Sequence, residues 1–195
     1  FRELGANDEV RVIVLASRAN AFCAGLDLKE FAAVGLKGSA KSSLEFPEKL
    51  RALFDCCEGI EACPKPVIAA VNGLCIGGGL DIVSACDIRL CTEDASFSLR
   101  EAAIGLVADM GVLQRLPHVI GQGFTREVAF TARFYKAKEA QAMGLVNAVH
   151  PDGAAMLEAA KKLAREIAAN APLAVQATKE VLNASRHLPV ADGMS

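Results

Sequence analysis

The stretch Asn72–Asp87 reads NGLCIGGGLDIVSACD, and its three consecutive glycines open an apolar run with helical character. Glycines weaken regular structure, so a triplet is typical of a place where the backbone comes very close to another group. At the start of a helix, free N–H groups and the positive end of the helix dipole favour a negative oxygen. The stretch therefore predicts a backbone site for an oxygen that carries or develops negative charge.

Strand-like and helix-like patterns alternate around this stretch. Apolar runs predict strands at Arg11–Ser17, Val67–Val71, Asp87–Cys91, Ser96–Leu99 and Leu145–Val149. Apolar residues at helical spacing predict helices at Phe46–Ile60, Gly111–Val119, Phe124–Phe130, Lys138–Met143, Gly153–Ala169 and Pro172–Arg186. This order indicates an α/β domain with mostly parallel strands and a helical C-terminal part.

Two connections lie between the first strand and the first helix. Arg18–Leu28 is a loop rich in small residues, which lets a ligand approach the backbone closely, and Lys29–Ser43 is predicted to be a mobile connection. No linker or repeat divides the chain, so we expect one domain over residues 1–195. Its core would span residues 1–150, and residues 151–195 would begin the helical region. Because the chain starts at Phe1 in mid-flow, we expect it to be a fragment of a longer polypeptide.

Composition excludes several classes of function. The 195 residues are 52% hydrophobic with a mean hydropathy of +0.30, which is sufficient for a substantial core. No apolar run reaches the roughly 18 residues of a membrane span. The net charge is −2 and the basic residues are scattered, so no surface for nucleic acid is predicted.

The cysteines indicate a reducing compartment. There are seven, an odd number, mostly in apolar stretches and without a C-x-x-C pair. We interpret them as buried free thiols of an intracellular protein, with a zinc site as a much weaker alternative.

The glycine triplet also suggests nucleotide binding, but the spacing excludes it. If Gly77 and Gly79 begin a G-x-G-x-x-G motif, Ile82 stands where the third glycine belongs, and no P-loop motif occurs anywhere. A G-x-S-x-G nucleophile elbow is missing as well, so a hydrolase of that type is not predicted.

Carboxylates remain as the candidate catalytic groups. Asp81 lies in the apolar helix, Glu101 follows a strand, and Asp109 sits in a loop almost without other polar groups. Each has a structural alternative: Asp109 could cap the next helix, Glu101 could be a solvated partner of Arg100, and Asp81 could pair with a backbone donor or a distant arginine. Three acids beside an apolar, glycine-lined surface nevertheless favour proton transfer, because such carboxylates have raised pKa values.

Three segments together resemble the enoyl-CoA hydratase/isomerase, or crotonase, superfamily. They are AFCAGLDLKEF (Ala21–Phe31), CPKPVIAAVNGLCIGGGLDIVSACDIRL (Cys63–Leu90) and Glu101–Leu116. The resemblance covers nearly the whole chain. It implies a spiral of β-β-α units, acyl-CoA thioester substrates, no metal or other cofactor, and a homotrimer or homohexamer. It also implies that N-terminal strands and the last C-terminal helices lie outside this chain.

The resemblance also implies roles for individual residues. The N–H groups of Ala24 and Gly78 would form an oxyanion hole for the thioester oxygen. Asp81 and Glu101 stand where the hydratases have two glutamates, and Asp109 stands where they have an uncharged residue. That third acid, together with aspartate at position 81, is the pattern of the dienoyl-CoA isomerases within the superfamily. The path of the CoA would be lined by Gly78 and by Ala24, Gly25, Leu26, Asp27 and Leu28.

The predicted reaction converts 3,5-dienoyl-CoA to 2,4-dienoyl-CoA in fatty-acid β-oxidation. Two conjugated double bonds move when a proton leaves carbon 2 and another reaches carbon 6, so acid–base groups must serve both ends of the diene. Our hypothesis is that Glu101 takes the first proton, Asp109 supplies the second, and Asp81 positions Glu101 or tunes its charge. The location would be mitochondrial or peroxisomal in a eukaryote and cytoplasmic in a bacterium.

Two alternatives stay open. An enoyl-CoA hydratase would use two carboxylates to add water to 2-enoyl-CoA, and Asp109 would then have no role. A non-catalytic acyl-CoA binder could use the same fold, since one fold hosts many functions.

Overall fold

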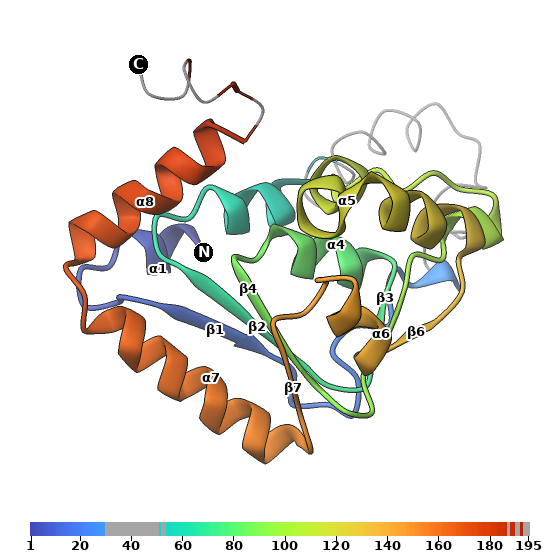
Figure 1. Cartoon of the computed structure of the whole chain (residues 1–195), viewed down its shortest axis with the longest axis horizontal. Helices are drawn as coiled ribbons and strands as arrows, with labels where there is room; N and C mark the ends of the chain where they lie inside the picture. Colours follow the sequence, from blue (N-terminus) through green and yellow to red (C-terminus); the bar gives the residue numbers. More distant parts are fainter. Residues whose placement is uncertain (30–50, 52–53, 187, 190–191, 193–195) are drawn as a thin grey trace.

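A four-stranded parallel sheet forms the centre of the protein. The computed structural model describes residues 1–29, 51, 54–186, 188–189 and 192. The strands β1 (Ile13–Ala16), β2 (Val67–Val71), β4 (Ile88–Thr92) and β7 (Ala148–His150) lie in the order β1-β2-β4-β7, and every neighbouring pair is parallel (Figure 1). All five residues of β2 are buried, as expected for an apolar central strand.

A smaller sheet extends from the end of β2. It contains β3 (Leu74–Ile76), β5 (Ser96–Ser98) and β6 (Tyr135–Lys136), with β3 and β5 parallel and β5 and β6 antiparallel. An isolated bridge joins Cys23 to Cys75, so the loop after β1 runs beside β3.

Helices follow or separate most of the strands. Residue 51 and residues 54–61 are helical, and Glu101–Ile104 forms the 3₁₀ helix η1. The α-helices with described bounds are α1 (Arg2–Ala6), α4 (Gly78–Ala85), α5 (Val112–Thr131), α6 (Ala137–Ala142), α7 (Gly153–Ala168) and α8 (Pro172–Ala184).

Hydrophobic clusters cover both faces of the parallel sheet. Helix α7 lies along one face, and α4 and α5 lie on the other side (Figure 1). The α7 side is packed by Ile68, Ala70, Leu90, Met156 and Ala160. The larger cluster on the opposite side includes Val67, Val71, Leu80, Val83 and Leu116. Because alternate residues of β2 point to opposite faces, one short strand contributes to both clusters.

The predicted α/β organisation is confirmed, with shifts at element ends. The strand expected at Leu145–Val149 begins later, at Ala148. The helices expected at Gly111–Val119 and Phe124–Phe130 are two parts of α5 that meet at a kink, where Gly121 has φ 75° and ψ 165°. Helix α1 and strands β3 and β6 were not predicted. The connection expected at Lys29–Ser43 lies almost entirely outside the described residues, as does the start of the helix expected at Phe46–Ile60.

All seven cysteines are free thiols. Five are buried as predicted, whereas Cys23 is partly exposed and Cys56 is exposed. Within the described part of the chain, none of the helices has the length and apolar character needed to cross a membrane.

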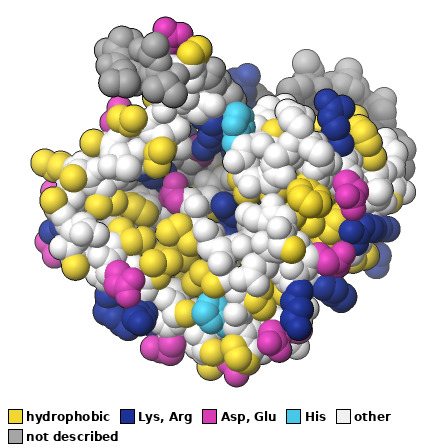
Figure 2. All heavy atoms as spheres, in the orientation of Figure 1, with side chains coloured by type: hydrophobic (Ala, Val, Ile, Leu, Met, Phe, Trp, Pro, Cys, Tyr) yellow, Lys and Arg dark blue, Asp and Glu magenta, His cyan; other side chains and the backbone are white. Residues whose placement is uncertain are grey.

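Lys179 attaches α8 to the end of the parallel sheet. Its side chain is 7% exposed, and its Nζ lies 2.7 Å from Oδ2 of Asp87 and 3.2 Å from the carbonyl oxygen of Lys65. The same Asp87 oxygen accepts the N–H of Val67 at 2.7 Å. Lys179 and Asp87 line one wall of a groove of about 780 Å³ between α8 and the helices over the sheet, and Figure 2 shows the hollow at this place.

We expect Lys179→Met to lower the free energy of unfolding by about 1–2 kcal/mol, because it removes the cation from the partly exposed Asp87 carboxylate and leaves the buried carbonyl of Lys65 without its donor. Equilibrium unfolding in urea at pH 7 measures the change. Lys161→Met is the matched control: it breaks the exposed pair with Glu158 and should cost less than about 1 kcal/mol. Equal losses in the two variants would contradict this role of Lys179.

Candidate functional site

The glycine triplet forms a tight turn from β3 into α4. Gly77 has φ 53° and ψ −117°, a conformation that favours glycine, and its N–H donates to the carbonyl of Ser98 at 2.9 Å. Gly78 is the first residue of α4, so its N–H belongs to the unsatisfied donors of a helix N-terminus. The predicted helix start at the triplet is confirmed.

The loop after β1 packs directly against this turn. Cys23 donates its N–H to the carbonyl of Leu74 at 3.0 Å and accepts the N–H of Ile76 at 2.9 Å. A Cβ atom on Gly79 would lie 2.9 Å from Cβ of Cys23, so glycine at position 79 is what permits this approach. Ala24, the next residue of the loop, is thereby brought beside the start of α4.

The two predicted oxyanion-hole donors are available for a ligand. Among the backbone hydrogen bonds of the described residues, none uses the N–H of Ala24 or that of Gly78. The rest of the predicted CoA path is open, since Leu26 is 44% exposed and Leu28 is 50% exposed. Gly25 has φ 89°, and a Cβ atom there would lie 3.0 Å from the carbonyl oxygen of Ile76.

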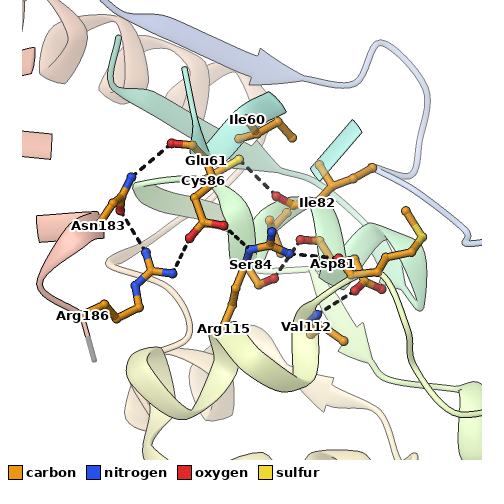
Figure 3. A network of polar contacts seen from close by, with 12 residues as sticks. Ile60, Glu61, Asp81, Ile82, Ser84, Cys86, Val112, Arg115, Asn183 and Arg186 are labelled. Carbon is orange, nitrogen blue, oxygen red and sulfur yellow. Dashed lines mark hydrogen bonds and ion pairs between the residues drawn. The ribbon is translucent and has the colours of Figure 1, made fainter. Parts of the chain in front are cut away.

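Asp81 caps helix α5 from the neighbouring helix α4. Its side chain is buried, and Oδ1 accepts the N–H of Val112, the first residue of α5, at 2.9 Å (Figure 3). The residue before Val112 is Gly111, which has no side chain that could cap the helix. The structural alternative of a backbone donor for Asp81 is therefore confirmed, and it can coexist with a role in the site.

Burial dominates the electrostatics of Asp81. It raises the pKa of this carboxyl to about 6, while the hydrogen bond from Val112 lowers it. The negative charges of Glu101 and Asp109 also raise the pKa, and Arg115 lowers it. All three predicted acids therefore lie within electrostatic reach of one another.

Glu101 has a buried oxygen without a partner. The residue opens η1, directly after β5, and a Cβ atom on Gly77 would lie 2.9 Å from its Oε1. Its Oε2 is buried and has no hydrogen-bond partner in the described part of the chain. Burial raises its pKa, its own backbone N–H lowers it, and the charge of Asp109 raises it further. A partly desolvated carboxylate beside the triplet, with one oxygen that has no partner among the described residues, is suited to accept a proton.

Arg100 does not hold Glu101 at the surface. Its Nη1 donates to the carbonyl of Ala132 at 2.8 Å, and its guanidinium carbon lies 5.4 Å from the ring centre of Phe134. The alternative that Glu101 is a solvated partner of Arg100 is therefore wrong.

Asp109 is exposed, in the loop between η1 and α5. The N-cap of α5 is Gly111, so the prediction that Asp109 might cap this helix is wrong. The loop passes next to the triplet at Met110: a Cβ atom on Gly78 would lie 3.8 Å from the Met110 sulfur. Asp109 and Met110 also line a cavity of about 360 Å³ next to the helical segment that contains Glu61.

The sequence did not point to Arg115, which holds this loop. Its Nε donates to Oε2 of Glu61 at 2.9 Å, and its Nη1 donates to the carbonyl of Met110 at 2.9 Å. The one sequence feature that could have indicated this contact is Gly111, four residues before Arg115. A Cβ atom at Gly111 would lie 2.3 Å from Nη1 of Arg115. Among the described residues, no group of three His, Cys, Asp or Glu side chains could hold a metal ion.

Comparisons with known proteins show that the chain belongs to the enoyl-CoA hydratase/isomerase family. A family model described as enoyl-CoA hydratase/isomerase matches residues 1–194. The human protein named mitochondrial Delta(3,5)-Delta(2,4)-dienoyl-CoA isomerase is 44% identical over 200 residues, covering 100% of this chain and 61% of its own length. A peroxisomal protein of the same name from Arabidopsis thaliana is 40% identical, covering 98% of this chain and 70% of its own length.

A solved structure confirms the predicted fold. The crystal structure of an enoyl-CoA hydratase from Bacillus anthracis superposes with a TM-score of 0.89 at 34% identity, covering 99% of this chain and 72% of that one. The expected crotonase-type α/β fold is therefore confirmed, whereas the division of the chain into a core and a helical region stays a prediction.

We expect Asp81→Asn to change stability in a pH-dependent way. The pKa of Asp81 is raised from 3.8 to about 6, so its contribution to stability is fully present below about pH 4 and is lost as the pH rises through 6. Asparagine does not titrate. Relative to wild type, the variant should therefore gain about 2 kcal/mol between pH 4 and pH 7.5, measured by urea unfolding.

The matched control is Asp152→Asn. Asp152 also accepts one backbone N–H at the start of a helix, that of Ala155 at 2.8 Å, but it is exposed. A stability difference between Asp81→Asn and wild type that stays constant with pH would contradict the raised pKa.

Proposed function

We propose that this chain, which belongs to the enoyl-CoA hydratase/isomerase family, converts 3,5-dienoyl-CoA to 2,4-dienoyl-CoA. The observation that carries the proposal is the third acid, Asp109, in electrostatic reach of Asp81 and Glu101. The 44% identity to the human protein with the isomerase name supports it. The chain spans 61% of that protein's length, so the activity is proposed for the whole protein.

The first step removes a proton from carbon 2. Glu101 is the proposed base, because its buried Oε2 has no partner among the described residues and its pKa is raised. The electron pair of the broken C–H bond moves into the thioester carbonyl and the diene, giving an extended dienolate. The raised pKa makes this carboxylate a better proton acceptor than an ordinary surface glutamate.

The negative charge of the dienolate collects on the thioester oxygen. The N–H groups of Ala24 and Gly78 would donate to that oxygen, helped by the positive end of the α4 dipole. Losing one such donor typically costs about 10²–10³ in rate, so the hole would matter as much as the acids. The exposed residues from Ala24 to Leu28 would carry the CoA portion of the substrate past this point.

The second step delivers a proton to carbon 6. Asp109 is the proposed acid, because it lies in the exposed loop that follows η1, whereas Glu101 opens η1 itself, and it would serve the far end of the diene. Double bonds then stand at carbons 2 and 4, and the overall reaction is redox-neutral. Asp81 is proposed to position Glu101 or tune its charge, and it fixes α5 through Val112.

The biological setting is proposed on the same basis. A role in fatty-acid β-oxidation follows from the substrate, and the location would be mitochondrial or peroxisomal in a eukaryote, as in the names of the relatives. The bacterial counterpart would be cytoplasmic. We further propose a homotrimer or homohexamer that needs no cofactor.

An enoyl-CoA hydratase is the second candidate, because similar solved structures carry that name. The deciding experiment supplies a 3,5-dienoyl-CoA and follows the absorbance of the product, whose diene is conjugated with the carbonyl. Rapid hydration of a 2-enoyl-CoA without this absorbance gain would refute the isomerase. Tight CoA binding without turnover of either substrate would instead indicate a non-catalytic binder.

We expect Asp109→Asn and Glu101→Gln to separate the two proton transfers. Asp109→Asn should lower isomerisation by about 10²–10⁴ but still exchange the carbon 2 proton of the substrate with deuterium from D₂O. Glu101→Gln should lose both activities. NMR of the recovered substrate measures the exchange. Asp109→Asn with unchanged isomerisation would leave Asp109 without a catalytic role.

A further inference from the structure

A chain of charged side chains connects the Asp109 loop to the C-terminal end of α8. Glu61 lies at its centre, between Arg115 of α5 and Arg186, which follows α8 (Figure 3). Asn183 completes the connection, because its Nδ2 donates to the backbone carbonyl of Glu61 at 3.1 Å and its Oδ1 accepts from Arg186 at 3.0 Å.

Arg115 forms the link from this chain to the loop. It is 8% exposed, and its two hydrogen bonds reach different segments: Nε to the carboxylate of Glu61 and Nη1 to the carbonyl of Met110. Met110 directly follows Asp109, so the guanidinium holds the peptide next to the proposed acid. A planar guanidinium can make both bonds at once, which a lysine ammonium cannot match in geometry.

Gly111 is shaped for the same contact. It has φ 98°, and a Cβ atom at this position would lie 2.3 Å from Nη1 of Arg115 and 3.0 Å from its guanidinium carbon. The opposite end of the turn is fixed independently, by the hydrogen bond from Val112 to Asp81. The turn at residues 109–112 is therefore held from two sides, by a carboxylate of α4 and by a guanidinium of α5.

We infer that Arg115, braced by Glu61 and Arg186, is a positioning residue that sets the place of Asp109 for proton delivery to the far end of the diene. This inference rests on the proposed function. Arg115 acts through the Met110 carbonyl and needs no contact with the substrate. The buried ion pair thus serves to fix a loop in one arrangement, a use for which such pairs are retained at some sites.

A double-mutant cycle tests the inference. Arg115→Met should lower kcat for isomerisation by about tenfold or more at an unchanged KM, and it should retain carbon 2 exchange. In the Asp109→Asn background the same change should add less than about twofold, because its target is already gone. Arg115→Lys should recover part of the loss. Full multiplicative losses in the double mutant would overturn the inference, since they indicate an effect independent of Asp109.

Two controls bracket the measurement. Gly111→Ala should reproduce the loss of kcat, because its methyl group displaces the guanidinium. Arg133→Met breaks exposed ion pairs with Glu127 and Glu139 and should leave kcat unchanged, because within the described part of the chain no side-chain hydrogen bond of Arg133 reaches residues 109–112. An unchanged kcat in Arg115→Met would overturn the inference directly.

Hydrogen exchange separates this inference from the proposed function. In Arg115→Met, the amides of Val112 and Gln114 should exchange about tenfold faster, whereas the buried amides of β2 should not change. If wild type fails to isomerise dienoyl-CoA, the proposed function is refuted. Unchanged amide exchange in Arg115→Met would overturn the positioning role of Arg115, whatever the activity of wild type. Faster amide exchange in Arg115→Met, together with a lower kcat than wild type, supports the positioning role of Arg115.

Discussion

One hydrogen bond, from the N–H of Val112 to the buried carboxylate of Asp81, determines how the site is assembled. It joins the start of α5 to α4, so the loop that carries Asp109 begins and ends on elements fixed to the glycine triplet. The bond places a carboxylate inside an apolar helix, and the cost of desolvating it appears as its raised pKa. A purely structural cap could use a neutral side chain, so the retained charge is consistent with a site that handles protons.

Local patterns were sufficient to predict the elements around the triplet. Val67–Val71 was predicted with its observed bounds, because an apolar run of this length between a proline and Asn-Gly fits a central parallel strand. The helix start at Gly78 followed from the backbone freedom of the triplet. Asp109 was found because it interrupts an otherwise apolar loop, and Glu101 because it follows a predicted strand. By contrast, β3 was missed, since three residues after a turn show no usable periodicity.

Contacts between distant segments could not be predicted in this way. Nothing in the sequence pairs Asp81 with Val112 or Arg115 with both Glu61 and Met110, because these bonds depend on how α4, α5 and the helical segment before β2 pack. The capping alternative for Asp109 failed for the same reason. Asp109 lies close enough in sequence to the start of α5 to cap it. The first amide of α5, that of Val112, instead donates to Asp81 of α4.

The topology of the parallel sheet has a consequence for how the chain reaches this state. Each strand pairs with one far away in sequence, as Ile13 does with Val67 and Leu90 with Ala148. No hairpin can nucleate such a sheet, and β4 keeps an open edge until β7 has left the ribosome and α7 can cover the face. The strand order therefore favours slow folding with a transiently exposed sheet edge, independently of any residue in the site.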